Sequence, residues 1–182
     1  SPAQIGVVQA ALRVGEFDLA RLTAVALRQE QPSDPGVISL YGDAMWSAGL
    51  FEEAREAYAN AAALNPDEAR AHNGLAKVLA AKVRYAEALD QALTAVRLAP
   101  QESDFSSTLG ATYQRMGRYQ EASAEFERFL TLLPKARQDD RALVARSTIT
   151  SLRSYGREVP NRMAGGPDAV HVLPFRLSDE KI

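Results

Sequence analysis

Residues 103–134, SDFSSTLGATYQRMGRYQEASAEFERFLTLLP, contain the pattern that decides the fold. A Leu-Gly pair is followed by a second glycine, an aromatic residue, an alanine and a final proline, which are Leu109-Gly110, Gly117, Tyr119, Ala122 and Pro134. Apolar residues recur at helical spacing on both sides of Gly117, and a proline stops a helix. The segment is therefore predicted to form two helices joined by a short turn.

The same landmarks recur every 34 residues along the chain. The prolines are Pro32, Pro66, Pro100 and Pro134, the aromatic residues are Phe17, Phe51, Tyr85 and Tyr119, and the alanines are Ala20, Ala54, Ala88 and Ala122. A period of this length is typical of stacked helical hairpins. Because two short helices cannot bury their apolar faces alone, successive copies are expected to share one continuous core.

Two positions of the repeat predict local geometry. The turn between the two helices requires positive φ, which glycine adopts without strain. Gly15, Gly49 and Gly117 occupy this position, but the third copy has Val83. The alanines that recur every 34 residues are expected where the two helices cross most closely, since a larger side chain would push the helix axes apart.

This combination resembles the tetratricopeptide repeat (TPR) family over about residues 2–134. The third copy departs from the family pattern at Ala76, Val83 and Ala92, and the family's frequent opening tryptophan is absent from every copy. The resemblance implies an all-α, right-handed α-solenoid of helix-turn-helix units. The four units are expected to span residues 1–34, 35–68, 69–102 and 103–134.

A different pattern follows the last of these prolines. Small and apolar residues recur at spacings of three and four, namely Ala142, Ala145, Ile149 and Leu152. They predict a helix over residues 135–156 that caps the apolar end of the stack. Residues 157–182 are expected to form an extended tail. Its candidate docking side chains are Val172, Leu173, Phe175 and Leu177.

Composition and charge narrow the class of partner. The 182-residue chain has no cysteine and a formal charge of −2, so no strong overall field attracts nucleic acid or membrane. Residues 135–162 are basic, but we interpret them as a solvated helix face and expect no nucleic-acid partner. No apolar run approaches the ~20 residues that cross a bilayer, so no membrane span is expected.

No arrangement of residues indicates catalysis. The sequence lacks a nucleophile elbow, a phosphate-binding glycine loop and a zinc-ligand cluster. His72 and His171 stand far apart, and His72 is interpreted as a structural or groove residue. We therefore predict that the chain is not an enzyme and has neither a cofactor nor a metal site.

The TPR resemblance implies that the first helices of successive units line a concave groove that holds a partner peptide or helix. At the corresponding places this chain has Gln9, Leu12, Arg13, Asp43, Trp46, Arg70, Asn73, Lys77 and Gln114. Trp46 lies off the scaffold positions of its helix, so it is a candidate anchor, with a core position as the alternative.

One sub-class of the family is disfavoured. Chaperone-tail-binding repeats clamp a terminal carboxylate with a cluster of Lys, Asn and Arg. The matching places here contain no cation and are Ser39, Asp43, Gly74, Asp104 and Thr108. The set that starts one repeat earlier contains a single cation, Arg70.

Three interpretations of the function remain from the sequence. The first is a non-catalytic protein–protein interaction module that binds a partner peptide or helix in its groove. The second is an assembly scaffold whose tail mediates homo-oligomerisation. The third is the repeat domain of a larger enzyme, because residues 170–177 resemble the lead-in strand of retroviral-type aspartyl protease domains. The opening Ser1-Pro2, in place of Met, fits a segment of a longer chain.

Overall fold

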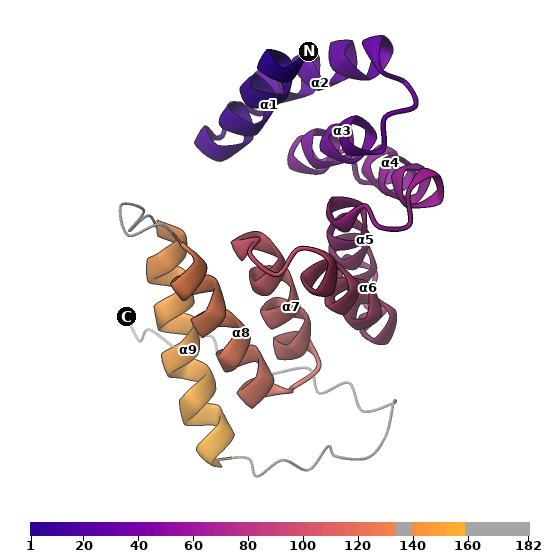
Figure 1. Ribbon diagram of the computed structural model, residues 1–182. Helices are drawn as coiled ribbons and strands as arrows, with labels where there is room; N and C mark the ends of the chain where they lie inside the picture. Colours follow the sequence, from indigo (N-terminus) through magenta and orange to yellow (C-terminus); the bar gives the residue numbers. More distant parts are fainter. Residues whose placement is uncertain (134–139, 159–182) are drawn as a thin grey trace, which may run out of the picture.

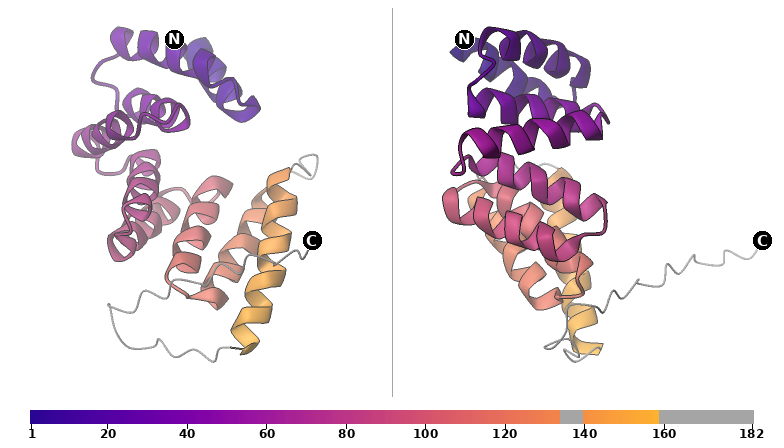
Figure 2. Two further views of the ribbon diagram at one scale, coloured as in Figure 1. Left: turned by 180° about the vertical axis from the view of Figure 1, so that it is seen from behind. Right: turned by 90° about the vertical axis from the view of Figure 1, so that its right-hand side faces the viewer.

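The structure, a computed structural model, describes residues 1–133 and 140–158, which form helices and no strand (Figure 1). The helices are α1 (Pro2–Val14), α2 (Phe17–Glu30), α3 (Pro35–Ser47), α4 (Phe51–Leu64), α5 (Ala69–Ala81), α6 (Tyr85–Leu98), α7 (Ser103–Arg115), α8 (Tyr119–Leu132) and α9 (Asp140–Glu158). Each packs on the next along the chain, and together they form a curved stack (Figures 1 and 2). The predicted all-α solenoid is confirmed.

Helix α3 begins where its capping residues require. Asp34 is the N-cap, and its Oδ1 accepts a hydrogen bond of 3.0 Å from the backbone N–H of Val37. Pro35 occupies the first helical position, where its missing N–H costs no hydrogen bond. The partner helix α4 ends at Leu64, just before Pro66, because the residue preceding a proline is kept out of the helical conformation.

The turns inside the helical hairpins all have left-handed backbone geometry. Gly15, Gly49 and Gly117 have φ of 81°, 79° and 73°, and Val83 has φ of 64°. The N–H of Arg84 donates to the carbonyl of Leu79 at 2.9 Å, as Leu50 N–H does to Met45. The third turn therefore has the same form as the others, although this conformation costs about 1–2 kcal/mol for a residue with a Cβ.

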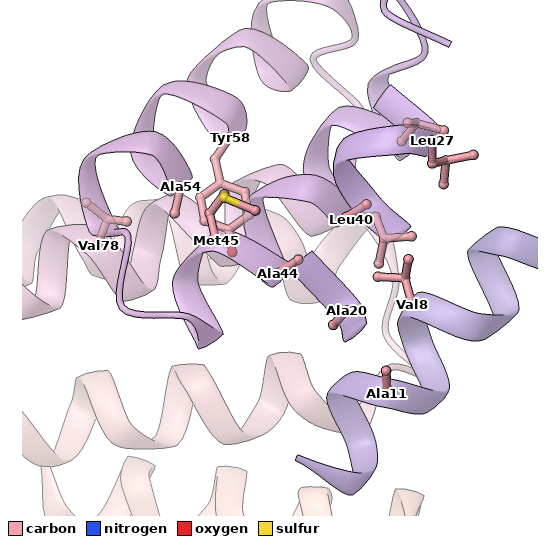
Figure 3. Close-up of a cluster of buried hydrophobic side chains, with 12 residues drawn as sticks. Val8, Ala11, Ala20, Leu27, Leu40, Ala44, Met45, Ala54, Tyr58 and Val78 are labelled. Atoms are coloured by element: carbon pink, nitrogen blue, oxygen red, sulfur yellow. The ribbon is translucent and has the colours of Figure 1, made fainter. Parts of the chain in front are cut away.

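Buried apolar clusters span the junctions between successive hairpins. The repeat alanines Ala20, Ala54, Ala88 and Ala122 are completely buried, as expected for the closest helix crossings. One apolar cluster contains Val8 of α1, Leu27 of α2, Met45 of α3, Tyr58 of α4 and Val78 of α5 (Figure 3). A shared core of this kind makes each hairpin depend on its neighbours for burial.

Helix α9 closes the far end of the stack. Ile149 and Leu152 pack with Ala122 and Phe126 of α8, and Ala142 and Ala145 are also buried. The capping helix predicted over residues 135–156 is thus observed as α9, while residues 134–139 and 159–182 lie outside the described part. The tail candidates Val172, Leu173, Phe175 and Leu177 lie there too. None of the described helices is both long enough and apolar enough to cross a bilayer.

Candidate partner-binding face

The odd-numbered helices lie on the inside of the curve. Helix α1 contacts α3, α3 contacts α5, and α5 contacts α7, whereas no contact joins the even-numbered helices α2, α4, α6 and α8 to one another. In a curved stack, neighbours are closest together on the inner side (Figure 1). We call the inward-facing side of α1, α3, α5 and α7 the concave face. The groove residues that the sequence proposed all belong to these four helices, and their role in partner binding stays a prediction.

Asp43 is already engaged within the protein. The hydroxyl of Tyr58 donates to Asp43 Oδ1 at 2.8 Å, and Arg70 Nη1 donates to Asp43 Oδ2 at 2.9 Å. Only 17% of the Asp43 side chain and 35% of the Arg70 side chain are exposed. These two proposed contact residues therefore link α3 to α5, and both carboxylate oxygens are occupied before any partner arrives.

The Tyr58 ring is held between two glycines. A Cβ added to Gly42 would lie 2.7 Å from the ring, and one added to Gly74 would lie closer still. The completely buried ring thus uses space that only glycine leaves free on α3 and on α5. The Tyr-Gly pair at Tyr41-Gly42 was recognisable from the sequence, but Gly74 lies outside the repeat pattern and its role was missed.

Burial and the neighbouring Asp43 carboxylate set the protonation states of Tyr58 and Arg70. Burial raises the pKa of Tyr58 well above its ordinary value, and the adjacent Asp43 carboxylate adds to the rise. Burial works against the charge of Arg70, but the attraction and hydrogen bond of Asp43 raise its pKa above the ordinary value. At neutral pH Tyr58 is therefore a neutral donor and Arg70 a charged one.

Trp46 is shared between the core and the concave face. It is half-buried and packs against the apolar cluster that spans α1 to α5. Its ring meets the ring of Phe51 edge-on, with centroids 5.0 Å apart. Part of the Trp46 side chain therefore supports the core and part remains accessible, while its role as an anchor for a partner stays a prediction.

The proposed contact residues at the two ends of the concave face are half-buried or exposed. On α1, Gln9 and Leu12 are half-buried and Arg13 is exposed. Arg13 Nε donates to the backbone carbonyl of Gln9 at 3.1 Å, so its charge has no acidic partner. Gln114 of α7 is half-buried, and its amide makes no hydrogen bond to any described residue.

Helix α5 presents unsatisfied polar groups at its middle. Asn73 is only 3% exposed, and its Oδ1 is buried without a hydrogen-bond partner. Lys77 follows one turn later on the same side of the helix, is half-buried, and forms no ion pair with a described residue. Most buried polar atoms in proteins are paired, so the unpaired Oδ1 of Asn73 is unusual, and the half-buried Lys77 beside it on the helix has a charge that no described residue neutralises.

Both ring nitrogens of His72 form hydrogen bonds within the protein. Its Nδ1 lies 2.7 Å from Oε1 of Gln91 on α6, and its Nε2 lies 2.7 Å from the carbonyl of Pro66. The ring thus bridges α5 to α6 and to the preceding loop. Within residues 1–133 and 140–158, no group of three or more metal-ligating side chains comes together. His171 lies outside the described residues.

Comparison with known proteins places these features in a family. Models of the tetratricopeptide repeat match residues 40–103 and residues 107–135. The Hsp70-Hsp90 organizing protein of Triticum aestivum is 33% identical over 132 residues, which are 70% of this chain. The chain spans 23% of the length of that protein.

Solved structures share the fold. A thermophilic TPR protein of Thermus thermophilus has a TM-score of 0.66 at 23% identity, covering 84% of this chain and 80% of its own. The first TPR of Spaghetti (RPAP3), bound to the HSP90 peptide SRMEEVD, has a TM-score of 0.57 at 21% identity. That match covers 66% of this chain and 94% of the other.

Proposed function

Because the chain belongs to the tetratricopeptide repeat family, we propose that it is a non-catalytic interaction protein that holds a segment of a partner protein on its concave face. One observation carries the proposal. Lys77 of α5 is half-buried without an ion-pair partner among the described residues, Asn73 one turn before it has a buried Oδ1 without a hydrogen bond, and the half-buried Trp46 belongs to the contacting helix α3. A partner segment would satisfy the polar groups and cover the indole.

The relatives support a peptide-like partner without naming it. The Spaghetti TPR was solved with a peptide bound, and the wheat relative is named for organising two chaperones. This chain lacks a cation at Ser39, Asp43, Gly74, Asp104 and Thr108, the places where chaperone-tail-binding repeats clamp a terminal carboxylate. We therefore propose a partner segment recognised by other groups than such a clamp.

Trp46 and Lys77 are proposed as the main contacts. Trp46 and Lys77 belong to the contacting helices α3 and α5, so an apolar side chain and a polar group of one partner segment could meet them together. Losing an anchor of this kind typically costs about 2 kcal/mol or more of binding. Asp43 and Arg70 shape the surface between them but are used internally. Gln9, Leu12, Arg13 and Gln114 extend the proposed surface toward its two ends.

The test compares captured proteins. The full chain would be immobilised, and the proteins retained from a lysate would be identified by mass spectrometry for wild type and for Trp46→Ala/Lys77→Ala. A matched control, Leu93→Ala/Arg97→Ala, removes one apolar side chain and one cation from exposed positions on α6. We expect the first pair to lose partners that the control retains. Equal sets for all three proteins would refute the proposal.

A further inference from the structure

The charged residues of the concave face fall into two classes. Helices α1, α3, α5 and α7 contain two acidic residues, Asp43 and Asp104. Both are paired: Asp43 with Arg70 at 2.9 Å, and Asp104 with Arg141 of α9 at 2.7 Å. The acidic charge of this face is therefore neutralised from within the protein.

The remaining cations of the same helices have no acidic partner. Arg13, Lys77 and Arg115 form no ion pair with any described residue. Elsewhere, Arg55 of α4 pairs with Glu52, and Arg118, the N-cap of α8, pairs with Glu121, both at 2.8 Å, whereas Arg97 of α6 forms no ion pair with a described residue. The concave face thus has surplus positive charge, although residues 1–134 have an overall excess of acidic residues. A ligand for this face would be attracted by negative charge.

We propose that Lys77 and Asn73 form a subsite for the side-chain carboxylate of an acidic residue in an extended segment of the partner; this inference rests on the function proposed above. The ammonium of Lys77 supplies a charge-assisted hydrogen bond to the carboxylate. The carboxamide of Asn73 lies one helical turn away and makes no internal hydrogen bond. Its Nδ2–H donors would add a second hydrogen bond to the carboxylate, while its Oδ1 is buried in the protein.

The chemistry favours a carboxylate within a chain over one at a chain end. A terminal carboxylate is held by several converging donors, whereas Asn73 is neutral and buried and Lys77 is a single charge. Arg70, the nearest other cation on α5, already donates to Asp43 at 2.9 Å. One cation and one amide match one Asp or Glu side chain next to a peptide bond.

The experiment uses random dodecapeptides displayed on phage as N-terminal fusions, so that no peptide has a free C-terminus. The full chain and two charge reversals, Lys77→Glu and Arg97→Glu, would be the baits. Arg97 is exposed on α6 and serves as the matched control. Wild type and Arg97→Glu are expected to enrich Asp or Glu at one position, and Lys77→Glu to enrich Lys or Arg there. Circular dichroism would verify that all baits are folded.

A synthetic amidated peptide from the selection gives the quantitative result. Replacing its selected Glu by Gln should weaken binding to wild type by about tenfold, the effect typical of losing one charge-assisted hydrogen bond. The same replacement should change binding to Lys77→Glu by less than about twofold. The variant Asn73→Ala should bind the unmodified peptide more weakly than wild type does, but should still prefer the peptide with Glu to the one with Gln.

Three results would overturn the subsite. Wild-type selection without acidic enrichment, or an identical preference in Lys77→Glu, would reject the subsite while leaving a peptide-binding face in place. Enrichment only in a second library with free C-termini would assign recognition to a terminal carboxylate. No enrichment above the bare support in either library would reject both the subsite and the proposed function.

Discussion

Two neighbouring junctions of the stack are held together by different means. At the Tyr58 junction, where α3–α4 meet α5–α6, an aromatic ring fills the space between Gly42 and Gly74 and bonds to Asp43. At the Ala92 junction, where α5–α6 meet α7–α8, the buried contacts are the small and aliphatic residues Ala76, Ala92 and Leu109. The same repeat pattern therefore allows one junction that is filled by an aromatic ring and another that is packed by small and aliphatic side chains.

The polar contacts follow the same division. Arg70 with Asp43, Ser39 with Glu68 and Lys82 with Glu52 all cross the Tyr58 junction at 2.9–3.0 Å. Among described residues, one side-chain hydrogen bond crosses the Ala92 junction, from Arg128 to the carbonyl of Pro100 at 3.0 Å. The ion pair with Arg70 neutralises Asp43 at the first junction, whereas Lys77 of α5 and Arg115 of α7 form no ion pair with a described residue.

Substituting Gly74→Ala should break the Tyr58 junction and have the largest effect. The new Cβ would overlap the Tyr58 ring, which Gly42 confines on its other side and Asp43 holds by its hydroxyl. Overpacking typically costs about 1–3 kcal/mol, and the confined ring places this change at the upper end. The free energy of unfolding from urea titration would measure it. Gly6→Ala, where a Cβ meets nothing within 4 Å, is the control and should stabilise α1 by about 0.5–1 kcal/mol.

Substituting Arg70→Met should weaken the same junction by about 1–2 kcal/mol, because one oxygen of the half-buried Asp43 loses its donor. Arg84→Met is the control, since its pair with Glu87 is exposed and should contribute about 0.5 kcal/mol or less. A double-mutant cycle with Asp43→Asn should show clear coupling to Arg70. Additive effects of the two changes would contradict the contact described here.

Substituting Val83→Gly should stabilise the hairpin that borders both junctions by about 1 kcal/mol. Val83 has φ of 64°, a conformation that glycine adopts without strain, and this gain exceeds the added flexibility of the unfolded chain. Thermal and urea unfolding would both show the shift. The reverse change at an equivalent turn, Gly49→Ala with φ of 79°, should lower stability, and a gain there would contradict the explanation.

The smallest predicted effect concerns Glu125, beyond the Ala92 junction on α8. Burial raises its pKa, while Arg128 and Ser106 act in the opposite direction. The folded state holds this proton more tightly than the unfolded state does. The protonated carboxyl therefore adds to the free energy of unfolding below about pH 4.5, and this stabilisation is lost as pH rises through the folded-state pKa. Glu125→Gln should remove this loss and raise the free energy of unfolding at pH 7. The gain should be only a few tenths of a kcal/mol, because solvent screens the charge of a half-buried group. Exposed Glu53→Gln is the control.

The sequence was most informative about the scaffold. Proline spacing placed the helices, and glycine at Gly15, Gly49 and Gly117 identified turns whose φ is positive. These features depend on local sterics, which a repeat pattern records directly. The pattern also showed that Val83 must adopt a glycine-like turn, and its φ of 64° confirms this.

The candidate site was less predictable, because its chemistry depends on pairs that are distant in sequence. Asp43 and Arg70 stand 27 positions apart, and nothing in either repeat indicates that they bond. Their pairing changes a face of mixed charge into one with unpaired cations. Helix position left Trp46 between a groove and a core location, and only the structure shows that its half-buried indole packs on the core cluster and on Phe51.

The contact pattern between helices has a consequence for how this protein is made. Every helix contacts only its neighbours and, on the inner side, the next helix but one, so no described contact requires distant parts of the chain to meet. At translation rates of about 5–20 residues per second, a 34-residue period takes about 2–7 seconds to synthesise. Each hairpin can therefore settle on its predecessor while the ribosome is still producing the next one.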